Sequence, residues 1–200
     1  MRKDALRNRQ RVLEAADAMF REHGVEVSVG EIADAAGVGR GTLFRNFKNK
    51  DALIAAVLGE RLGEVLDYGR QLLVEDPDDA EVTFTFVTGL VERQEENRAL
   101  LQTVTDELFM SVPELQGAHA ALLELLGALL ARGKRVGAIR PEATATDLMM
   151  LVKGLCMYSS TDQQPLAAET IMRHLDLVRA AMTMPEYSRP LRGAPVPLPV

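Results

Sequence analysis

The stretch "SVGEIADAAGVGRGTLFRNFKNK", residues 28–50, contains the clearest fold signals in this 200-residue sequence. Ser28 is followed three residues later by Glu31, which is the pattern of a capping box at a helix start. The apolar residues after it predict a helix of about two turns that ends at Gly37. A third short helix is then expected over residues 40–46. Two brief helices joined by a glycine turn and held against a preceding helix match the helix-turn-helix plan, whose second helix enters the major groove of DNA.

The helix expected over residues 40–46 has two different faces. At about 100° per residue, Leu43 and Phe47 point to one side with Phe44 beside them, so these three are expected to anchor the helix. The opposite side carries Gly41, Thr42, Arg45 and Asn46. The segment is therefore predicted to bury an apolar stripe and to present a polar face.

The outward side chains suit a DNA duplex. Arg45 can form a bidentate fork with guanine, Asn46 can pair with adenine, and Thr42 offers a hydroxyl and a methyl group to thymine. Gly41 leaves no side chain where the start of the helix must approach DNA closely. The basic residues expected to contact phosphates are Arg40, Lys48 and Lys50.

A plainer interpretation exists for each of these charges, because a single basic residue on a helix is more often part of a solvated face. The combination of two short capped helices, a glycine turn, a basic face and a capped fourth helix favours DNA binding. The basic N-terminal residues have two interpretations, either contact with the DNA backbone or minor groove, or a frayed and solvated helix start. These residues are Arg2, Lys3, Arg7, Arg9 and Arg11.

Beyond this stretch, apolar residues recur at intervals of three and four, which predicts an all-α fold of about nine helices. The first helix is expected to stop near Gly24, and the fourth to begin after Asn49 and reach about residue 73. Later helices are expected near residues 79–95, 97–110, 113–135, 143–159 and 165–183. The expected domains are a helix-turn-helix domain at 1–50, a connecting helix at 51–74, a helical domain at 75–184 and a proline-rich disordered tail at 185–200.

Composition restricts the class of protein. Hydrophobic residues make up 47% of the chain and charged residues 26%, which is typical of a globular protein. The net charge is −6, but residues 1–50 carry +3 and residues 51–200 carry −9, so a polyanionic partner fits only the first part. No apolar run reaches the length of a membrane span, and we expect a cytoplasmic protein without a membrane partner.

Catalytic and metal sites are not expected. Cys156 is the only cysteine, which excludes an intramolecular disulfide and a cysteine-based zinc site. The histidines are scattered, and the chain has no Gly-x-Ser-x-Gly, P-loop or His-Glu-x-x-His motif. We therefore expect no enzyme, no cofactor and no metal. The rival functions are an all-helical protein-interaction adaptor without specific DNA binding, and a non-specific architectural DNA binder.

The stretches "VLEAADAMFREHG" and "SVGEIADAAGVGRGTLFRNFKNKDALI" follow the pattern of a known family. The pattern has an Ala-Ala…Phe…Gly first helix, an Ile-Ala…Ala-Gly-Val second helix, and a Gly-Thr-Leu-aromatic-x-x-Phe-x-x-Lys unit. Through these residues, positions 12–54 resemble the DNA-binding domain of TetR-family transcriptional regulators. The rest of the chain matches in layout only, because the family's second domain is variable, all-helical and dimeric.

This resemblance implies a ligand-responsive regulator, more often a repressor than an activator, that binds a palindromic operator as a homodimer. A small, largely apolar molecule would release or re-space it. The resemblance places Arg40, Gly41, Thr42, Phe44, Arg45 and Asn46 on the recognition helix, and Lys50 at a phosphate. Two positions depart from the family pattern. Gly39 replaces the common serine or threonine cap, and Phe44 replaces the usual tyrosine, so a phosphate contact from a phenolic hydroxyl is unavailable.

The helical domain contains candidate residues for an effector pocket and for a dimer interface. Flexible methionines and aromatic rings suit a pocket for irregular apolar ligands, although they also fill ordinary cores. The pocket candidates are Phe84, Phe109, Met110, His119, Met149, Met157 and Tyr158. The resemblance implies dimerisation through helices at 145–159 and 165–183 as a four-helix bundle. The interface candidates are Leu148, Val152, Leu155, Ile171, Leu175, Val178 and Met182.

Overall fold

The computed structural model describes residues 2–75, 79–92, 112–159 and 168–187. Within these ranges the chain is built from α-helices, as the sequence predicted, with a 3-10 turn and an isolated bridge between Ile139 and Thr183. None of the helices in these ranges is both long and apolar enough to cross a bilayer. The chain divides into two compact units.

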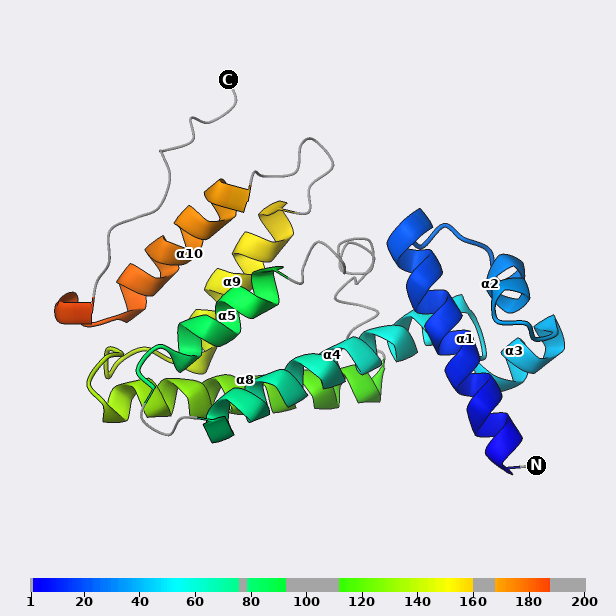
Figure 1. The fold of residues 1–200 in the computed structure, drawn as a ribbon, viewed down its shortest axis with the longest axis horizontal. Helices are drawn as coiled ribbons and strands as arrows, with labels where there is room; N and C mark the ends of the chain where they lie inside the picture. The colour runs from blue at the N-terminus through cyan, green and yellow to red at the C-terminus, as the bar shows by residue number, and fades with distance from the viewer. Residues whose placement is uncertain (1, 76–78, 93–111, 160–167, 188–200) are drawn as a thin grey trace, which may run out of the picture. The chain divides into compact units, whose positions relative to one another are not determined.

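The first unit comprises the described parts of Met1–Glu64 and Glu96–His119. Its helices are α1 (Arg2–His23), α2 (Val29–Ala35), α3 (Arg40–Asn46) and the first part of α4 (Lys50–Glu75). The first three pack against one another (Figure 1). Their shared core includes Val12, Ala16, Phe20, Ile32, Leu43, Phe47 and Leu53, together with Leu115 from the start of α8 (Pro113–Arg135).

The end of α1 and the start of α4 are where the sequence predicted them. Gly24 follows α1 with φ of 73°, in the left-handed region that glycine adopts without steric cost. Asn49 caps α4, because its Oδ1 accepts a hydrogen bond of 2.8 Å from the backbone N–H of Ala52. These local signals fix the lengths of the helices that frame α2 and α3.

An ion pair joins α1 to α4 inside the first unit. Arg61 donates from Nε and Nη2 to Asp17 Oδ1, at 2.8 and 2.5 Å. Arg21 donates to the other oxygen, Asp17 Oδ2, at 3.0 Å. The Arg61 side chain is 11% exposed, so solvent screens this pair less than an ordinary surface pair. Two donors on one carboxylate oxygen, in a shielded place, hold α1 and α4 in one orientation.

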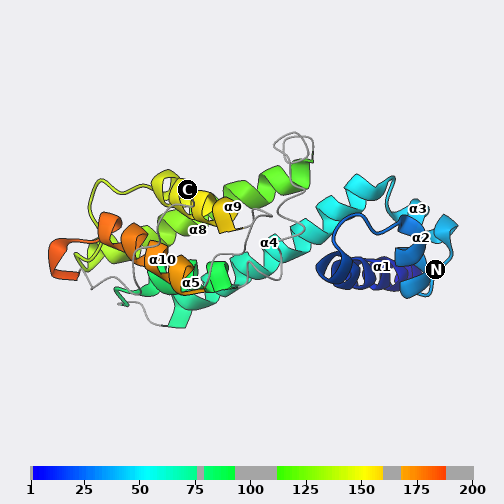
Figure 2. The same cartoon turned by 90° about the horizontal axis from the view of Figure 1, so that it is seen from above.

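The second unit comprises the described parts of Val65–Glu95 and Ala120–Val200. Its helices are the second part of α4, α5 (Val82–Glu92), most of α8 (Pro113–Arg135), α9 (Ala145–Ser159) and α10 (Ala168–Met182). Helix α5 is buried on nearly all sides and contributes Val82, Phe84, Phe86, Val87 and Val91 to the core. Helices α9 and α10 lie side by side, and α10 also contacts α5 (Figure 2).

Two arginines connect helices within the second unit. Arg132 of α8 donates to the carbonyl oxygens of Leu72, at 3.2 Å, and of Leu73, and so satisfies acceptors at the C-terminal end of α4. Arg179 of α10 pairs with Glu81, and its guanidinium carbon lies 5.2 Å from the centre of the Phe84 ring. Both contacts connect helices that are distant in sequence.

The later helices differ from their predicted ranges at some ends. Helix α8 has the predicted bounds, Pro113–Arg135. Helix α5 begins at Val82 rather than at 79, and its predicted end at 95 lies outside the described residues. Helix α9 begins at Ala145 rather than 143, because Thr144 caps it: the Thr144 Oγ1 accepts from Asp147 N–H at 3.1 Å. The helix predicted at 97–110 lies outside the described residues. Pro185–Tyr187 forms a 3-10 turn at the start of the segment for which a disordered tail was predicted, and residues 188–200 lie outside the described residues.

The side chains predicted for the dimer interface point instead into the core of the second unit. Leu148, Val152, Leu175, Val178 and Met182 are all buried within the single chain, and Ile171 packs against them. Leu155 lies on α9, with its side chain outside the described residues. Because the chain's own helices cover the buried side chains, assigning them to a second copy was wrong. The outer faces of the same helices expose Met150 by 66%, Leu151 by 41% and Leu177 by 45%.

Candidate nucleic-acid interface

Helix α2 begins with the predicted capping box. Glu31 N–H donates to Ser28 Oγ at 3.2 Å, and Ser28 N–H donates to Glu31 Oε2 at 2.9 Å. The Ser28 side chain, followed by its backbone, hydrogen-bonds the carboxylate and holds the pKa of Glu31 below its ordinary value of 4.5. The reciprocal bonds fix the first turn of α2.

A tight turn then directs the chain into α3. Gly37 has φ of 62°, and the N–H of Val38 donates to the carbonyl of Ala33 at 3.0 Å. Gly39 is the N-cap of α3 and, as predicted, supplies no side-chain hydrogen bond. Its carbonyl accepts from Thr42 N–H at 2.8 Å. The turn is therefore set mainly by backbone hydrogen bonds.

The inner face of α3 agrees with the sequence prediction at two of three positions. Leu43 is fully buried and Phe47 is 3% exposed, and the guanidinium carbon of Arg9 lies 4.5 Å from the centre of the Phe47 ring. Phe44 is 51% exposed, so its predicted role as an anchor was wrong. It lies at the edge of the apolar stripe, where about half of its surface stays exposed.

The outer face of α3 is preorganised by bonds within the helix. Arg45 donates from Nε to the Gly41 carbonyl at 3.1 Å and from Nη2 to Thr42 Oγ1 at 3.0 Å. Asn46 Nδ2 donates to the Thr42 carbonyl at 2.8 Å. Arg45 is exposed, whereas Thr42 and Asn46 are half-buried. A base edge would therefore have to replace some of these short-range bonds, which are solvent-accessible and individually weak.

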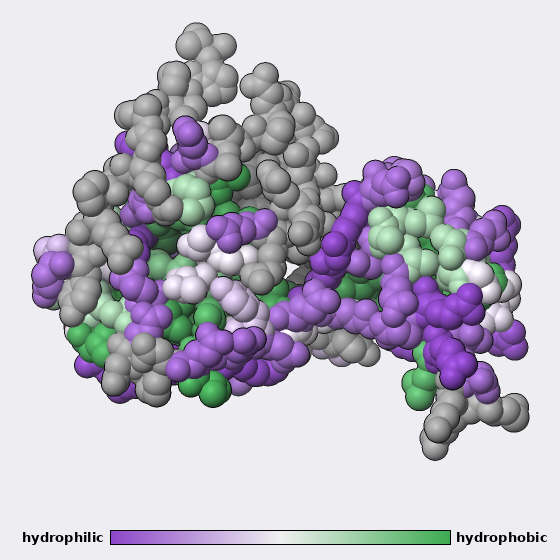
Figure 3. Space-filling model, viewed as in Figure 1, coloured by the Kyte–Doolittle hydropathy of each residue, from purple (hydrophilic) through white to green (hydrophobic). Residues whose placement is uncertain are grey.

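The predicted phosphate-contacting residues lie around this helix. Arg40 and Lys48 are exposed, and Lys50 is half-buried at the first position of α4. The Arg40 guanidinium rests on α2, with Nη2 2.4 Å from where a Cβ at Gly30 would stand. Residues 37–50 include no acidic side chain. In the view of Figure 3, hydrophilic residues occupy much of the surface of this unit.

Arg11 lies beside the turn between α2 and α3, although the sequence marked it only as one of the basic N-terminal residues. Arg11 of α1 places Nη2 3.5 Å from the Gly37 carbonyl, and α1 is helical from Arg2. Arg11 and Arg9 therefore lie beside the α2–α3 pair rather than on a frayed segment. Sequence spacing gives no sign of this, because the contact crosses 26 residues.

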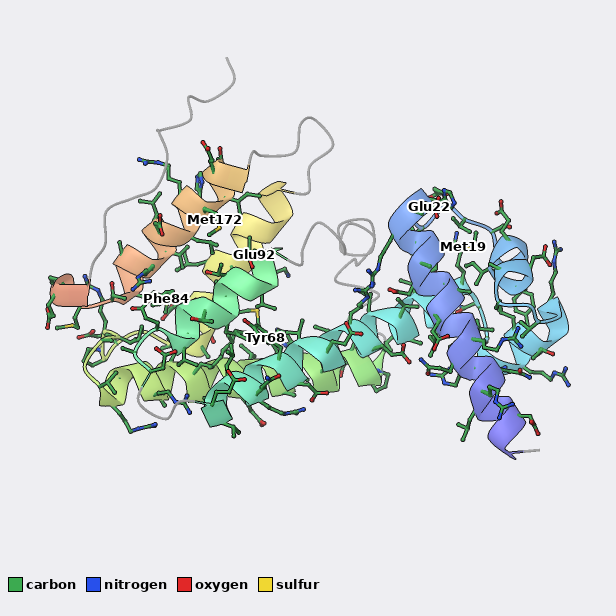
Figure 4. All side chains as sticks on the ribbon, in the orientation of Figure 1. Met19, Glu22, Tyr68, Phe84, Glu92 and Met172 are labelled. Carbon is green, nitrogen blue, oxygen red and sulfur yellow. The ribbon has the colours of Figure 1, made fainter. Side chains whose placement is uncertain are left out.

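The predicted effector residues are only partly brought together. Phe84 and Met149 share the apolar core of the second unit, where Figure 4 shows Phe84, Tyr68 and Met172 arriving from three different helices. His119 is exposed and belongs to the first unit. Met157 and Tyr158 lie on α9 with side chains outside the described residues, and Phe109 and Met110 lie outside them altogether.

The sequence did not single out Tyr68 as a member of this core. Its ring stacks on Phe86 with centroids 6.0 Å apart and an angle of 23° between the rings. The hydroxyl of Thr83, three residues before Phe86 on α5, is buried and has no hydrogen-bond partner among the residues that the structure describes. Across the described ranges, no three histidine, cysteine, aspartate or glutamate side chains come together as a metal site.

Two family models match the chain. The model described as bacterial regulatory proteins, tetR family, matches residues 12–57. The model described as the C-terminal domain of SbtR-like transcriptional regulators matches residues 76–183. An HTH-type transcriptional regulator of Staphylococcus aureus (strain USA300) is 38% identical over 105 residues, which cover 52% of this chain and 57% of that protein. The chain thus matches little more than half the length of this curated relative.

Solved structures match over a larger part of their length. A TetR transcription regulatory protein from Mycobacterium vanbaalenii is 32% identical, with a TM-score of 0.65, over 92% of this chain and 99% of that one. NalD of Pseudomonas aeruginosa, the secondary repressor of the MexAB-OprM multidrug efflux pump, is 25% identical, with a TM-score of 0.63, over 92% and 99%.

Proposed function

The chain belongs to the tetR family of bacterial regulatory proteins, and from that premise we propose that it is a ligand-responsive repressor of transcription. It is a regulator with a helix-turn-helix DNA-binding domain. In the proposal, two copies bind a palindromic operator in the cytoplasm through α3, and a small, largely apolar effector bound in the second unit lowers operator affinity. Repression rather than activation is proposed because NalD, which is similar over nearly its whole length, is a repressor.

The observation that carries the proposal is the surface around α3. Leu43 and Phe47 fix the helix to the core, and the exposed basic residues Arg40, Arg45 and Lys48 stand in a segment without acidic side chains. Phosphate groups provide the matching charge, and base edges provide acceptors for Arg45. A protein-interaction adaptor would need no such uniform sign of charge on a short helix.

The effector part of the proposal is supported by the family and by the composition of the second unit. Phe84 and Met149 contribute to one apolar cluster built from helices α4, α5, α8, α9 and α10. A ligand that prefers one arrangement of these helices would change operator affinity by its difference in affinity for the two states.

The test is a selection of random duplexes by the purified full chain. We expect a palindrome with half-sites about one helical turn, or roughly 34 Å, apart. Replacing Arg45 with Ala should weaken operator binding by about 1–3 kcal/mol, while Lys50→Ala should weaken every duplex and lower the salt slope by about one. Arg70→Ala is the matched control, since Arg70 is an exposed arginine of the second unit.

Two outcomes would contradict the proposal. If no duplex shows salt-dependent binding, the adaptor is the better interpretation. If random duplexes bind as tightly as any selected one, the protein is a non-specific binder. Equal weakening of random and selected duplexes by Arg45→Ala would contradict the role of Arg45 in reading sequence.

A further inference from the structure

Phe44 is an aromatic side chain that α3 holds in solvent. Its exposed fraction is 51%, whereas its neighbours on the inner face, Leu43 and Phe47, are 0% and 3% exposed. A single exposed apolar residue is common on protein surfaces and means little alone. The side chains and charges around the Phe44 ring indicate that it contacts a partner.

About half of the Phe44 side chain is exposed, and the positions toward which it leans carry no bulky side chain. Helical side chains lean toward the N-terminal end of their helix, which here is the end with Gly39 and Gly41. A Cβ built at either glycine would meet nothing within 4 Å. The longer side chains are directed elsewhere: Arg40 rests on Gly30 of α2, and Arg45 is bonded to the Gly41 carbonyl and the Thr42 hydroxyl.

The charge around Phe44 indicates what covers it when the protein is bound. Exposed Arg40, Arg45 and Lys48 lie at neighbouring positions, and residues 37–50 contain no carboxylate. An apolar protein surface would have to desolvate these cations without pairing them, which is costly. A polyanion that also has an apolar group at the floor of a groove would pair its charges with these cations and cover the Phe44 ring with the apolar group.

We propose that Phe44 reads the 5-methyl group of a thymine in the major groove of each operator half-site. The ring has no donor or acceptor, so it cannot distinguish bases by hydrogen bonds. The methyl group of thymine is the apolar group that unmodified bases present in that groove. This inference rests on the proposed function and assigns one base of the operator to one side chain.

The test removes only the methyl group. Each thymine of the selected operator is replaced in turn by deoxyuridine, and affinities are measured for the wild-type chain and for Phe44→Ala. At one position per half-site, the wild type should lose about three- to fivefold in affinity, the value expected for one buried methyl group. The Phe44→Ala variant should be insensitive at that position, and Lys48→Ala should keep the full loss.

The outcomes separate this inference from the proposed function. If no palindrome is selected, the proposed function fails and this inference fails with it. If a palindrome is selected but deoxyuridine has no effect at any position, or the same effect on Phe44→Ala as on the wild type, only the role of Phe44 is overturned. Because the side chain is half-exposed, Phe44→Ala should still fold and unfold cooperatively, which a circular-dichroism melt checks.

Discussion

At the scale of single residues, the reciprocal bonds of Ser28 and Glu31 can be tested directly. These bonds lower the pKa of Glu31 from its ordinary value of 4.5, so an NMR titration of its carboxyl carbon should have a midpoint below 4.5. Ser28→Ala removes the side-chain bond, the larger cause, and should move the midpoint upward. Asp147, whose pKa Thr144 lowers in the same way, should not move and serves as an internal control.

The direction of this shift also fixes a pH dependence. Because the folded state holds Glu31 at a lower pKa than the unfolded state, its contribution to stability is complete above 4.5 and is lost as the pH falls through the lowered folded value. The stability difference between the wild type and Ser28→Ala should therefore shrink in acid. A difference that stayed constant from neutral pH to below the folded pKa would contradict the assigned bonds.

Residues show where sequence reasoning succeeds and where it fails. The Ser28–Glu31 cap was predictable because both partners lie within one helical turn. The exposure of Phe44 was not, because it sits at the edge of the stripe and its burial depends on the shape of the neighbouring helices. Thr144 and Asp147 have the same spacing as Ser28 and Glu31, and this spacing indicates a helix start at Ala145, two residues after the predicted start of α9.

At the scale of helices, the glycines of α4 differ in what surrounds them. A Cβ at Gly69 would stand 2.4 Å from Leu125 Cδ2 and 2.8 Å from Phe86 Cε2, whereas one at Gly63 meets nothing within 4 Å. Gly69→Ala should therefore lower the free energy of unfolding by about 1–3 kcal/mol through overpacking. Gly63→Ala in the same helix should raise it by up to about 1 kcal/mol through helix propensity.

Chemical denaturation of the two variants measures this difference. The comparison is matched, because both changes add one methyl group to α4. A stabilised Gly69→Ala variant would mean that the buried Phe86 ring and Leu125 can move aside, and that α4 is not packed closely against α5 and α8.

Helices also explain why the dimer residues were misassigned. The stripe of Ile171, Leu175, Val178 and Met182 correctly predicted a buried face on α10. Periodicity shows that one face of a helix is buried, but it does not show whether the same chain or a second copy buries it. Here the core of the second unit buries it. The exposed apolar residues Met150 and Leu177 lie among polar residues on the outer faces of α9 and α10. They do not recur at a regular helical spacing, so the hydrophobic periodicity of the sequence did not reveal them.

At the scale of the whole molecule, we predict a dimer through the outer faces of α9 and α10. Met150→Glu and Leu177→Glu place charges on residues that are 66% and 45% exposed in the single chain, and should convert the dimer into a monomer by light scattering at micromolar concentration. Leu6→Glu, at an equally exposed position on α1 (66%), should remain a dimer. A monomeric wild type, or dimers in all three variants, would refute this interface.

The ion pair between Asp17 and Arg61 has a consequence for protein engineering. One way to make a biosensor is to fuse the helix-turn-helix segment α1–α3 to the sensor domain of another protein. The obvious junction for such a fusion is the start of α4. That junction would leave Asp17 without the Arg61 donors and strip Leu53, Ile54, Val57 and Leu58 from the core. A transferable segment must instead extend through Glu64, and its new host must supply an apolar side chain in the place of Leu115.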